Sequence, residues 1–126
     1  IKSSAMKFTA KVITGSGRGK KIGYPTINLD LNDVPEETKE GIYAGKTKVE
    51  DSEYLSAIHF GPRLFHNDPK AFEVHVIDSE LSELPSEIEV ELVEKLRDIR
   101  DFDSEEDLKD QISMDIAEAR AILGEP

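Results

Sequence analysis

The sequence predicts a mainly β fold, in which five or six short antiparallel strands form a barrel or a sandwich and one C-terminal helix packs on it. Short segments before residue 94 alternate apolar and polar residues, which is the period of a strand with one buried face. Glycine, proline and acidic residues separate these segments, as they do at turns. Only the end of the chain changes to a helical period. Because helices do not alternate with strands, a doubly wound α/β fold is not expected.

The first strand is expected over Met6–Ile13, where Phe8 and Ala10 share the apolar face. Four more segments repeat this alternation, and each predicts a strand with one face toward the core. These predicted strands are Ile42–Val49, Tyr54–Phe60, Phe72–Ile77 and Glu87–Val93. The intervening segments predict loops over Thr14–Gly23, Asn32–Gly41 and Gly61–Lys70.

The helix is expected to begin after Ser104, which can cap it, and to end at Gly124. Between them, apolar residues recur every three or four positions and form one amphipathic face. The residues of this face are Leu108, Ile112, Ile116, Ala119 and Leu123. The spacing predicts a helix of about five turns.

Length and composition restrict the function classes. The 126 residues suit one domain, with residues 1–5 expected to be a lead or vector remnant and residues 6–126 the folded domain. The absence of cysteine excludes a disulfide framework, a thiolate zinc site and a cysteine nucleophile. The formal net charge of −11 argues against a nucleic-acid or membrane partner. With no apolar run of about 20 residues, we expect a cytoplasmic protein.

The richest segment is Gly15–Asn28, which reads GSGRGKKIGYPTIN. Three alternate glycines, Gly15, Gly17 and Gly19, free the backbone to approach a ligand, and their N–H groups could point at phosphate oxygens. Lys20 and Lys21 add positive charge. The spacing matches neither a Walker A loop nor the dinucleotide fingerprint. A flexible surface hairpin is the competing interpretation.

Two further features can carry chemistry. In an extended segment, Thr26 and Asn28 face the same way, and their oxygens suit Mg²⁺. The alternative is that both side chains only satisfy a turn. Glu73 lies inside the apolar segment FEVHVI, where a carboxylate could accept a proton from an attacking hydroxyl. Its alternative role is that of a solvent-facing residue on a half-exposed strand.

The order of these signals is more specific than any one of them. The segments GSGRGKKIG, YPTIN, KEGIYAG, FEVHVID and KLRDIRDFDSEEDLKDQISMDIAEA follow one another along the chain. In this order they resemble the riboflavin kinase (flavokinase) family, from about Phe8 to Leu123. The resemblance implies a six-stranded antiparallel Greek-key barrel with a C-terminal α-helix.

The resemblance also implies an activity, the transfer of the γ-phosphate of ATP to the ribityl 5′-hydroxyl of riboflavin, giving FMN and ADP. We expect the protein to be a monomer. It assigns Glu73 as the catalytic base and Thr26 and Asn28 as the Mg²⁺-linked pair. Arg97 and Phe102 match the segment that closes over the flavin. The ATP-binding residues would be Gly15, Gly17, Gly19, Lys20, Lys21 and Thr26.

The chain also departs from the family pattern. A Tyr-Gly turn near the nucleotide is replaced by Ser82–Ser86, and Ile99 replaces an acid after Arg97. These departures motivate an alternative, a catalytically weak or inactive flavin- or nucleotide-binding module on the same barrel. An acidic interaction domain without a ligand is a third interpretation.

Overall fold

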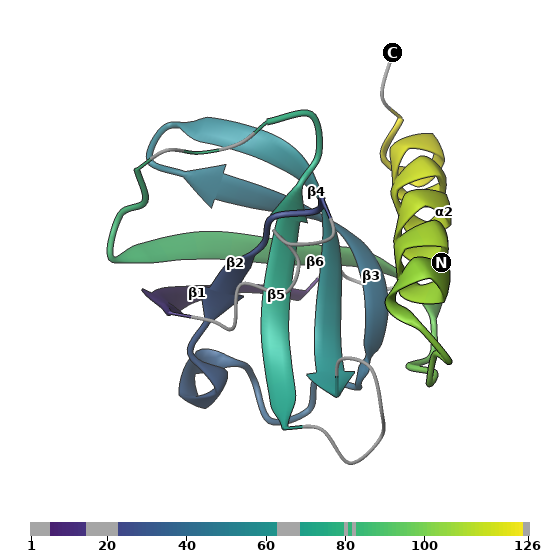
Figure 1. Ribbon diagram of the computed structural model, residues 1–126. Coiled ribbons are helices and arrows are strands. Elements are labelled where there is room, and N and C mark those ends of the chain that lie inside the picture. Colours follow the sequence, from purple (N-terminus) through teal and green to yellow (C-terminus); the bar gives the residue numbers. More distant parts are fainter. Residues whose placement is uncertain (1–5, 15–22, 63–68, 80, 82, 125–126) are drawn as a thin grey trace, which may run out of the picture.

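The strands close into one barrel, and a single long helix lies against its outer wall (Figure 1). The computed structural model describes residues 6–14, 23–62, 69–79, 81 and 83–124. The strands are β1 (Met6–Ile13), β2 (Ile27–Leu29), β3 (Gly41–Val49), β4 (Ser52–Pro62), β5 (Lys70–Val76) and β6 (Glu87–Arg97). A 3₁₀ turn, η1 (Leu31–Asp33), follows β2, and the helix is α2 (Glu105–Leu123).

The strand order around the barrel is β1-β2-β5-β4-β3-β6, and every neighbouring pair is antiparallel. Strands β3, β4 and β5 are consecutive neighbours, and β6 returns to lie beside β3. This connection is a Greek key. The predicted six-stranded antiparallel Greek-key barrel with a C-terminal helix is therefore confirmed.

The predicted elements agree with the observed ones in place and type. Strand β1 has the predicted bounds, whereas β6 continues past the predicted Val93 to Arg97. Two elements were not predicted. Strand β2 is too short to show an alternating pattern, and η1 lies at the start of a predicted loop, where the Asp30 carboxylate accepts a hydrogen bond from the Asn32 N–H.

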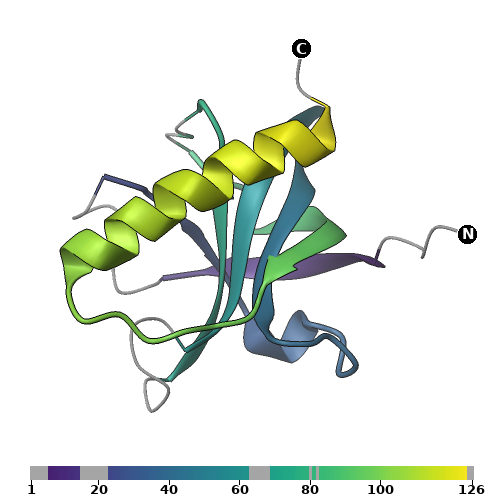
Figure 2. The same cartoon turned by 90° about the vertical axis from the view of Figure 1, so that its right-hand side faces the viewer.

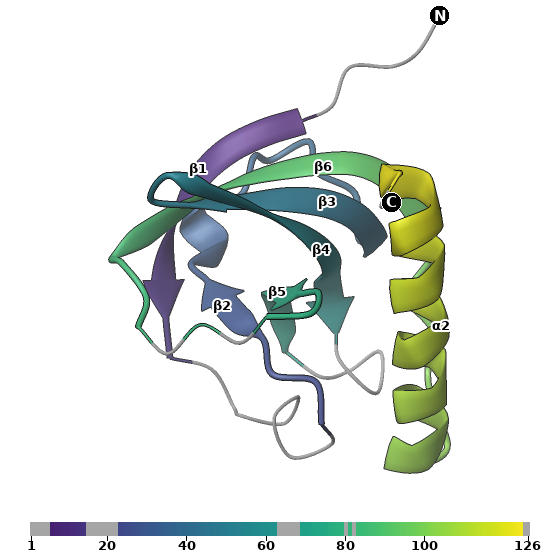
Figure 3. The same ribbon diagram turned by 90° about the horizontal axis from the view of Figure 1, so that it is seen from above.

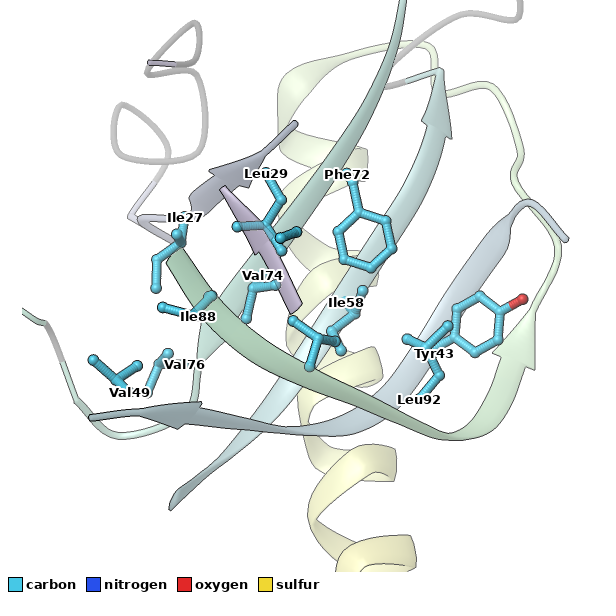
Figure 4. Packing of buried hydrophobic residues seen from close by; sticks show 12 residues of the cluster. Ile27, Leu29, Tyr43, Val49, Ile58, Phe72, Val74, Val76, Ile88 and Leu92 are labelled. Atoms are coloured by element: carbon cyan, nitrogen blue, oxygen red, sulfur yellow. The ribbon is translucent and has the colours of Figure 1, made fainter. Parts of the chain in front are cut away.

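The core fills the inside of the barrel with the inward-facing residues of all six strands (Figure 4). Aromatic and β-branched side chains dominate it, and such residues pack well on a pleated surface. Phe72 is almost completely buried and meets Phe8 edge-on, with 5.5 Å between the ring centroids. The outward-facing residues of the same strands lie on the other side of the sheet, where they can pack against another element.

Helix α2 packs against the outer face of the barrel and crosses it diagonally (Figure 2). The Ser104 hydroxyl accepts a hydrogen bond from the Asp107 N–H, and Gly124 ends the helix in the left-handed conformation with φ of 74°. Ala119 packs on Ala44 and Ile77, so small side chains let the helix approach closely. None of the helices that the structure describes is long and apolar enough to cross a membrane.

Gly45 on β3 tests how tightly the barrel is packed. A Cβ atom at this position would lie 2.5 Å from the Glu91 carbonyl oxygen and 2.5 Å from Ile58 Cδ1. Gly45→Ala is expected to lower the free energy of unfolding by about 2 kcal/mol, since a backbone oxygen cannot move aside cheaply. Urea denaturation measures the change. The control is Lys48→Ala at an exposed position of β3, and equal stabilities for the two variants would contradict the prediction.

Candidate functional site

Helix α2 stands beside β3 and β4 (Figure 3). A cleft lies between the outer face of the barrel and this helix. Residues 98–103, which connect β6 to the helix, complete its wall. The volume of the cavity inside the cleft is about 80 Å³, and its mouth opens to solvent. Apolar and polar side chains mix along it, and they include Tyr24, Thr26, Ile42, Ile58, His59, Glu73, His75, Arg97, Ile99, Arg100, Phe102, Leu108, Ile112 and Asp115.

One row of residues crosses five strands along the floor of the cleft. The pairing register places Asn28 opposite Glu73, Glu73 opposite His59, His59 opposite Ile42, and Ile42 opposite Arg97. Residues directly opposite each other on antiparallel strands share a face of the sheet. The register therefore brings a carboxylate, an amide and an imidazole together from positions far apart in the sequence.

Glu73 is the buried acid of this row, with only 7% of its surface exposed. It lies in the middle of β5, where the neighbouring residues Phe72 and Val74 point inward to the core. Alternation along the strand therefore directs the Glu73 side chain outward, into the cleft. The solvent-facing role considered for Glu73 is not what the structure shows, because the residue is buried and lines the cleft.

The Tyr24–Asn28 segment is fastened to β5 beside Glu73. His75 Nδ1–H donates to the Pro25 carbonyl oxygen over 2.9 Å, and the Tyr24 ring meets the imidazole edge-on with centroids 5.6 Å apart. This contact extends the short pairing of β2 with β5 and holds Thr26 against the cleft. The hydroxyl of Thr26 and the amide oxygen of Asn28 are hard donors of the kind that Mg²⁺ prefers. The described residues contain no cluster of three acids or histidines that could hold a metal alone.

A buried ion pair joins the helix to the barrel at the other end of the row. Arg97 donates from Nε to Asp115 Oδ1 over 2.9 Å and from Nη2 to Asp115 Oδ2 over 2.8 Å. Gln111 Nε2 donates a further bond of 3.0 Å to Asp115 Oδ1. Asp115 is 4% exposed, so its charge depends on these partners.

Exposed ion pairs fix the neighbouring segments. The side-chain hydrogen bond from Lys95 holds the pKa of the Asp98 carboxyl below its ordinary value and raises the pKa of Lys95. Near the other end of α2, the side-chain hydrogen bonds from Arg120 lower the pKa of Asp78. The helix is thus joined to the barrel at more than one point along its length.

Phe102 belongs to the connecting segment and is 5% exposed. Its ring packs with Leu108 and Ile112 of α2. Two guanidinium groups lie over the ring, with Arg100 Cζ 4.9 Å and Arg97 Cζ 5.8 Å from its centroid. This end of the cleft is therefore apolar with a cationic rim.

Four of the residues predicted for function line this one cleft: Thr26, Glu73, Arg97 and Phe102. Asn28 joins them through its register with Glu73. The predicted ATP-loop residues Gly15, Gly17, Gly19, Lys20 and Lys21 lie outside the described residues. The sequence interpretation did not single out His59, Arg100 or Asp115. For Asp115 the available signal was its place at the end of the KLRDIRDFDSEEDLKDQISMD stretch, within the family resemblance.

Comparison with known proteins finds one family across this chain. The family model for riboflavin kinase (flavokinase) matches residues 3–123. A bifunctional riboflavin kinase/FMN adenylyltransferase of Haemophilus influenzae is 34% identical over 119 residues, which are 93% of this chain and 38% of that protein. The riboflavin kinase of Mus musculus is 33% identical over 124 residues, covering 92% of this chain and 79% of the mouse protein.

A solved structure shares the fold. It is described as a macrolide-efflux protein from Streptococcus pneumoniae, and it superimposes with a TM-score of 0.80 at 27% sequence identity. The match covers 93% of this chain and 39% of that one. The chain likewise spans little more than a third of the bifunctional relatives, 38% of the Haemophilus influenzae protein and 35% of the Bacillus subtilis one.

The Arg97–Asp115 pair can be tested by its effect on stability. Asp115→Ala is expected to lower the free energy of unfolding by about 3 kcal/mol, because Arg97 would keep a half-buried charge without its partner. The double replacement Arg97→Met with Asp115→Leu is expected to recover most of this loss, since it removes both charges. Asp110→Ala, on the exposed side of α2, is the control in urea denaturation. A loss at Asp115 no larger than at Asp110 would show that the pair does not hold the helix.

Proposed function

The chain belongs to the riboflavin kinase family, and from this premise we propose that it transfers the γ-phosphate of ATP to the ribityl 5′-hydroxyl of riboflavin, giving FMN and ADP. The observation that carries the proposal is the position of Glu73. This carboxylate is buried in the cleft, with Asn28 opposite it in register and Thr26 also lining the cleft. A base beside an oxygen-donor pair is the arrangement that phosphoryl transfer to a hydroxyl needs.

In the proposed step, the 5′-oxygen of riboflavin attacks the γ-phosphorus. The new bond joins that oxygen to phosphorus, and the bond from the γ-phosphorus to the bridging oxygen of ADP breaks. Glu73 accepts the hydroxyl proton. Because phosphoryl transfer depends mainly on positioning and on neutralising charge, the chain's largest contribution is to hold the hydroxyl in line with the phosphate.

Thr26 and Asn28 are the proposed holders of Mg²⁺, since their side-chain oxygens lie two residues apart on one face of an extended segment. When bound, the ion neutralises phosphate charge. We extend the proposed ATP site to Gly15, Gly17, Gly19, Lys20 and Lys21 on the strength of the sequence resemblance alone.

The flavin ring is proposed to lie at the opposite end of the cleft, against the apolar wall that includes Phe102 and Leu108. Arg97 is occupied by Asp115 and lies near Phe102. We therefore propose that Arg97 supports flavin binding indirectly, by holding Phe102 and α2 in place along this wall.

The acidic composition and the lack of cysteine are consistent with a cytoplasmic monomer without nucleic-acid partners, which stays a prediction.

The activity is tested by incubating the protein with riboflavin, ATP and Mg²⁺ and separating FMN by chromatography. Glu73→Gln is expected to reduce kcat by about 100- to 10,000-fold, because it removes the proton acceptor and keeps the side-chain shape. The control is Glu94→Gln at an exposed position of β6. Flavin binding without FMN formation by the wild-type chain would instead support a non-catalytic binding module, in keeping with the altered Ser82–Ser86 segment.

The metal assignment is tested by Mg²⁺ titration of the same reaction. Asn28→Ala is expected to raise the Mg²⁺ concentration for half-maximal rate by about tenfold, because it removes an oxygen ligand or its support. Asn32→Ala, which changes an exposed amide in η1, is the matched control. An unchanged Mg²⁺ dependence in Asn28→Ala would remove this residue from the proposed metal site.

A further inference from the structure

The charged side chains that line the cleft differ in whether an oppositely charged side chain is paired with them. They are Glu73, Arg97, Arg100 and Asp115. Arg97 and Asp115 neutralise each other through two hydrogen bonds. Arg100 has no carboxylate partner among the residues that the structure describes, whereas Arg97 and Arg120, the other two described arginines, each hold one. The cleft therefore has one cation whose charge no described acid neutralises.

Arg100 is exposed, yet two contacts fix its direction. Its Nη1 donates to Gln111 Oε1 over 3.1 Å, and its Cζ lies 4.9 Å over the Phe102 ring. Gln111 is itself held by its bond to the buried Asp115. A guanidinium has more N–H donors than the single bond to Gln111 uses. Arg100 thus offers oriented donors beside the apolar wall of the cleft.

Arg100 lies at the Arg97 end of the row, where both guanidinium groups contact the Phe102 ring. From Glu73 to Arg97 the row crosses β5, β4, β3 and β6, which is three strand spacings or roughly 14 Å along the sheet. Arg100 follows Arg97 in the connecting segment, and its hydrogen bond to Gln111 keeps it beside the Arg97–Asp115 pair. A ligand that reaches both ends must carry its hydroxyl and its recognition edge at opposite ends of the molecule.

We propose that Arg100 determines flavin specificity by donating charge-assisted hydrogen bonds to the carbonyl oxygens on the pyrimidine edge of the isoalloxazine ring. This inference rests on the proposed function. With the 5′-hydroxyl at Glu73, the ribityl chain leads the ring system toward Phe102. The ring has one hydrocarbon edge and one carbonyl edge, and only the carbonyl edge can accept the donors of a guanidinium.

The test measures KM and kcat for riboflavin in Arg100→Gln, Arg100→Lys and Lys109→Gln. Arg100→Gln is expected to raise KM for riboflavin by about 10- to 100-fold, which corresponds to the loss of a hydrogen bond from a charged group. KM for ATP and kcat are expected to stay unchanged. Arg100→Lys, which keeps the charge and loses the fork, should fall between wild type and Arg100→Gln. Lys109→Gln removes an exposed cation from α2 outside the cleft lining and should behave as wild type.

Analogues in which sulfur replaces a ring carbonyl oxygen, 2-thioriboflavin and 4-thioriboflavin, separate recognition from a structural role. Wild type is expected to have a higher KM for at least one of them, since sulfur accepts hydrogen bonds weakly, and Arg100→Gln should lose this discrimination. A normal riboflavin KM in Arg100→Gln, or equal discrimination in both proteins, overturns the proposal for Arg100 alone. A wild-type chain that neither binds nor phosphorylates riboflavin overturns the proposed function as well. Matching thermal melts of the variants exclude unfolding as the cause.

Discussion

The buried pair between Arg97 and Asp115 is the contact on which the functional half of the molecule depends. A charge that is 4% exposed is tolerated only with a partner in good geometry, and two hydrogen bonds supply it. Because Asp115 lies midway along α2 and Arg97 ends β6, the pair fixes which face of the helix meets the barrel. The pair therefore fixes the position of the helical wall of the cleft relative to the wall formed by the barrel.

Strand β2 has a comparable role on the opposite side of the cleft. It is three residues long, yet it closes the barrel between β1 and β5. Its register places Asn28 opposite Glu73, and the hydrogen bond from His75 to Pro25 prolongs the contact. The closure of the barrel and the assembly of the polar row are therefore one event, because both depend on the pairing of β2 with β5.

The elements whose sequence pattern is long enough to show a period were predictable. Strand β1 and helix α2 have such patterns, whereas three residues in β2 cannot show alternation. The site was predictable only in part, because strand register is not a local property of the sequence. Asp115 illustrates a second limit, since an acid on an amphipathic helix is ordinarily solvent-exposed and only the facing Arg97 makes it a buried one.

The net charge of −11 and a phosphate ligand are compatible because charge acts locally. On the parts of β1, β3 and β6 outside the cleft, acids lie opposite lysines: Glu91 lies opposite both Lys7 and Lys46, and Glu89 lies opposite Lys48. Charges further apart than the Debye length, about 8 Å at physiological salt, are largely screened. What a ligand in the cleft meets is set instead by Glu73, by the neutralised pair and by Arg100. The polarity of the cleft, and not the total charge, is therefore what we expect to orient a ligand with distinct ends.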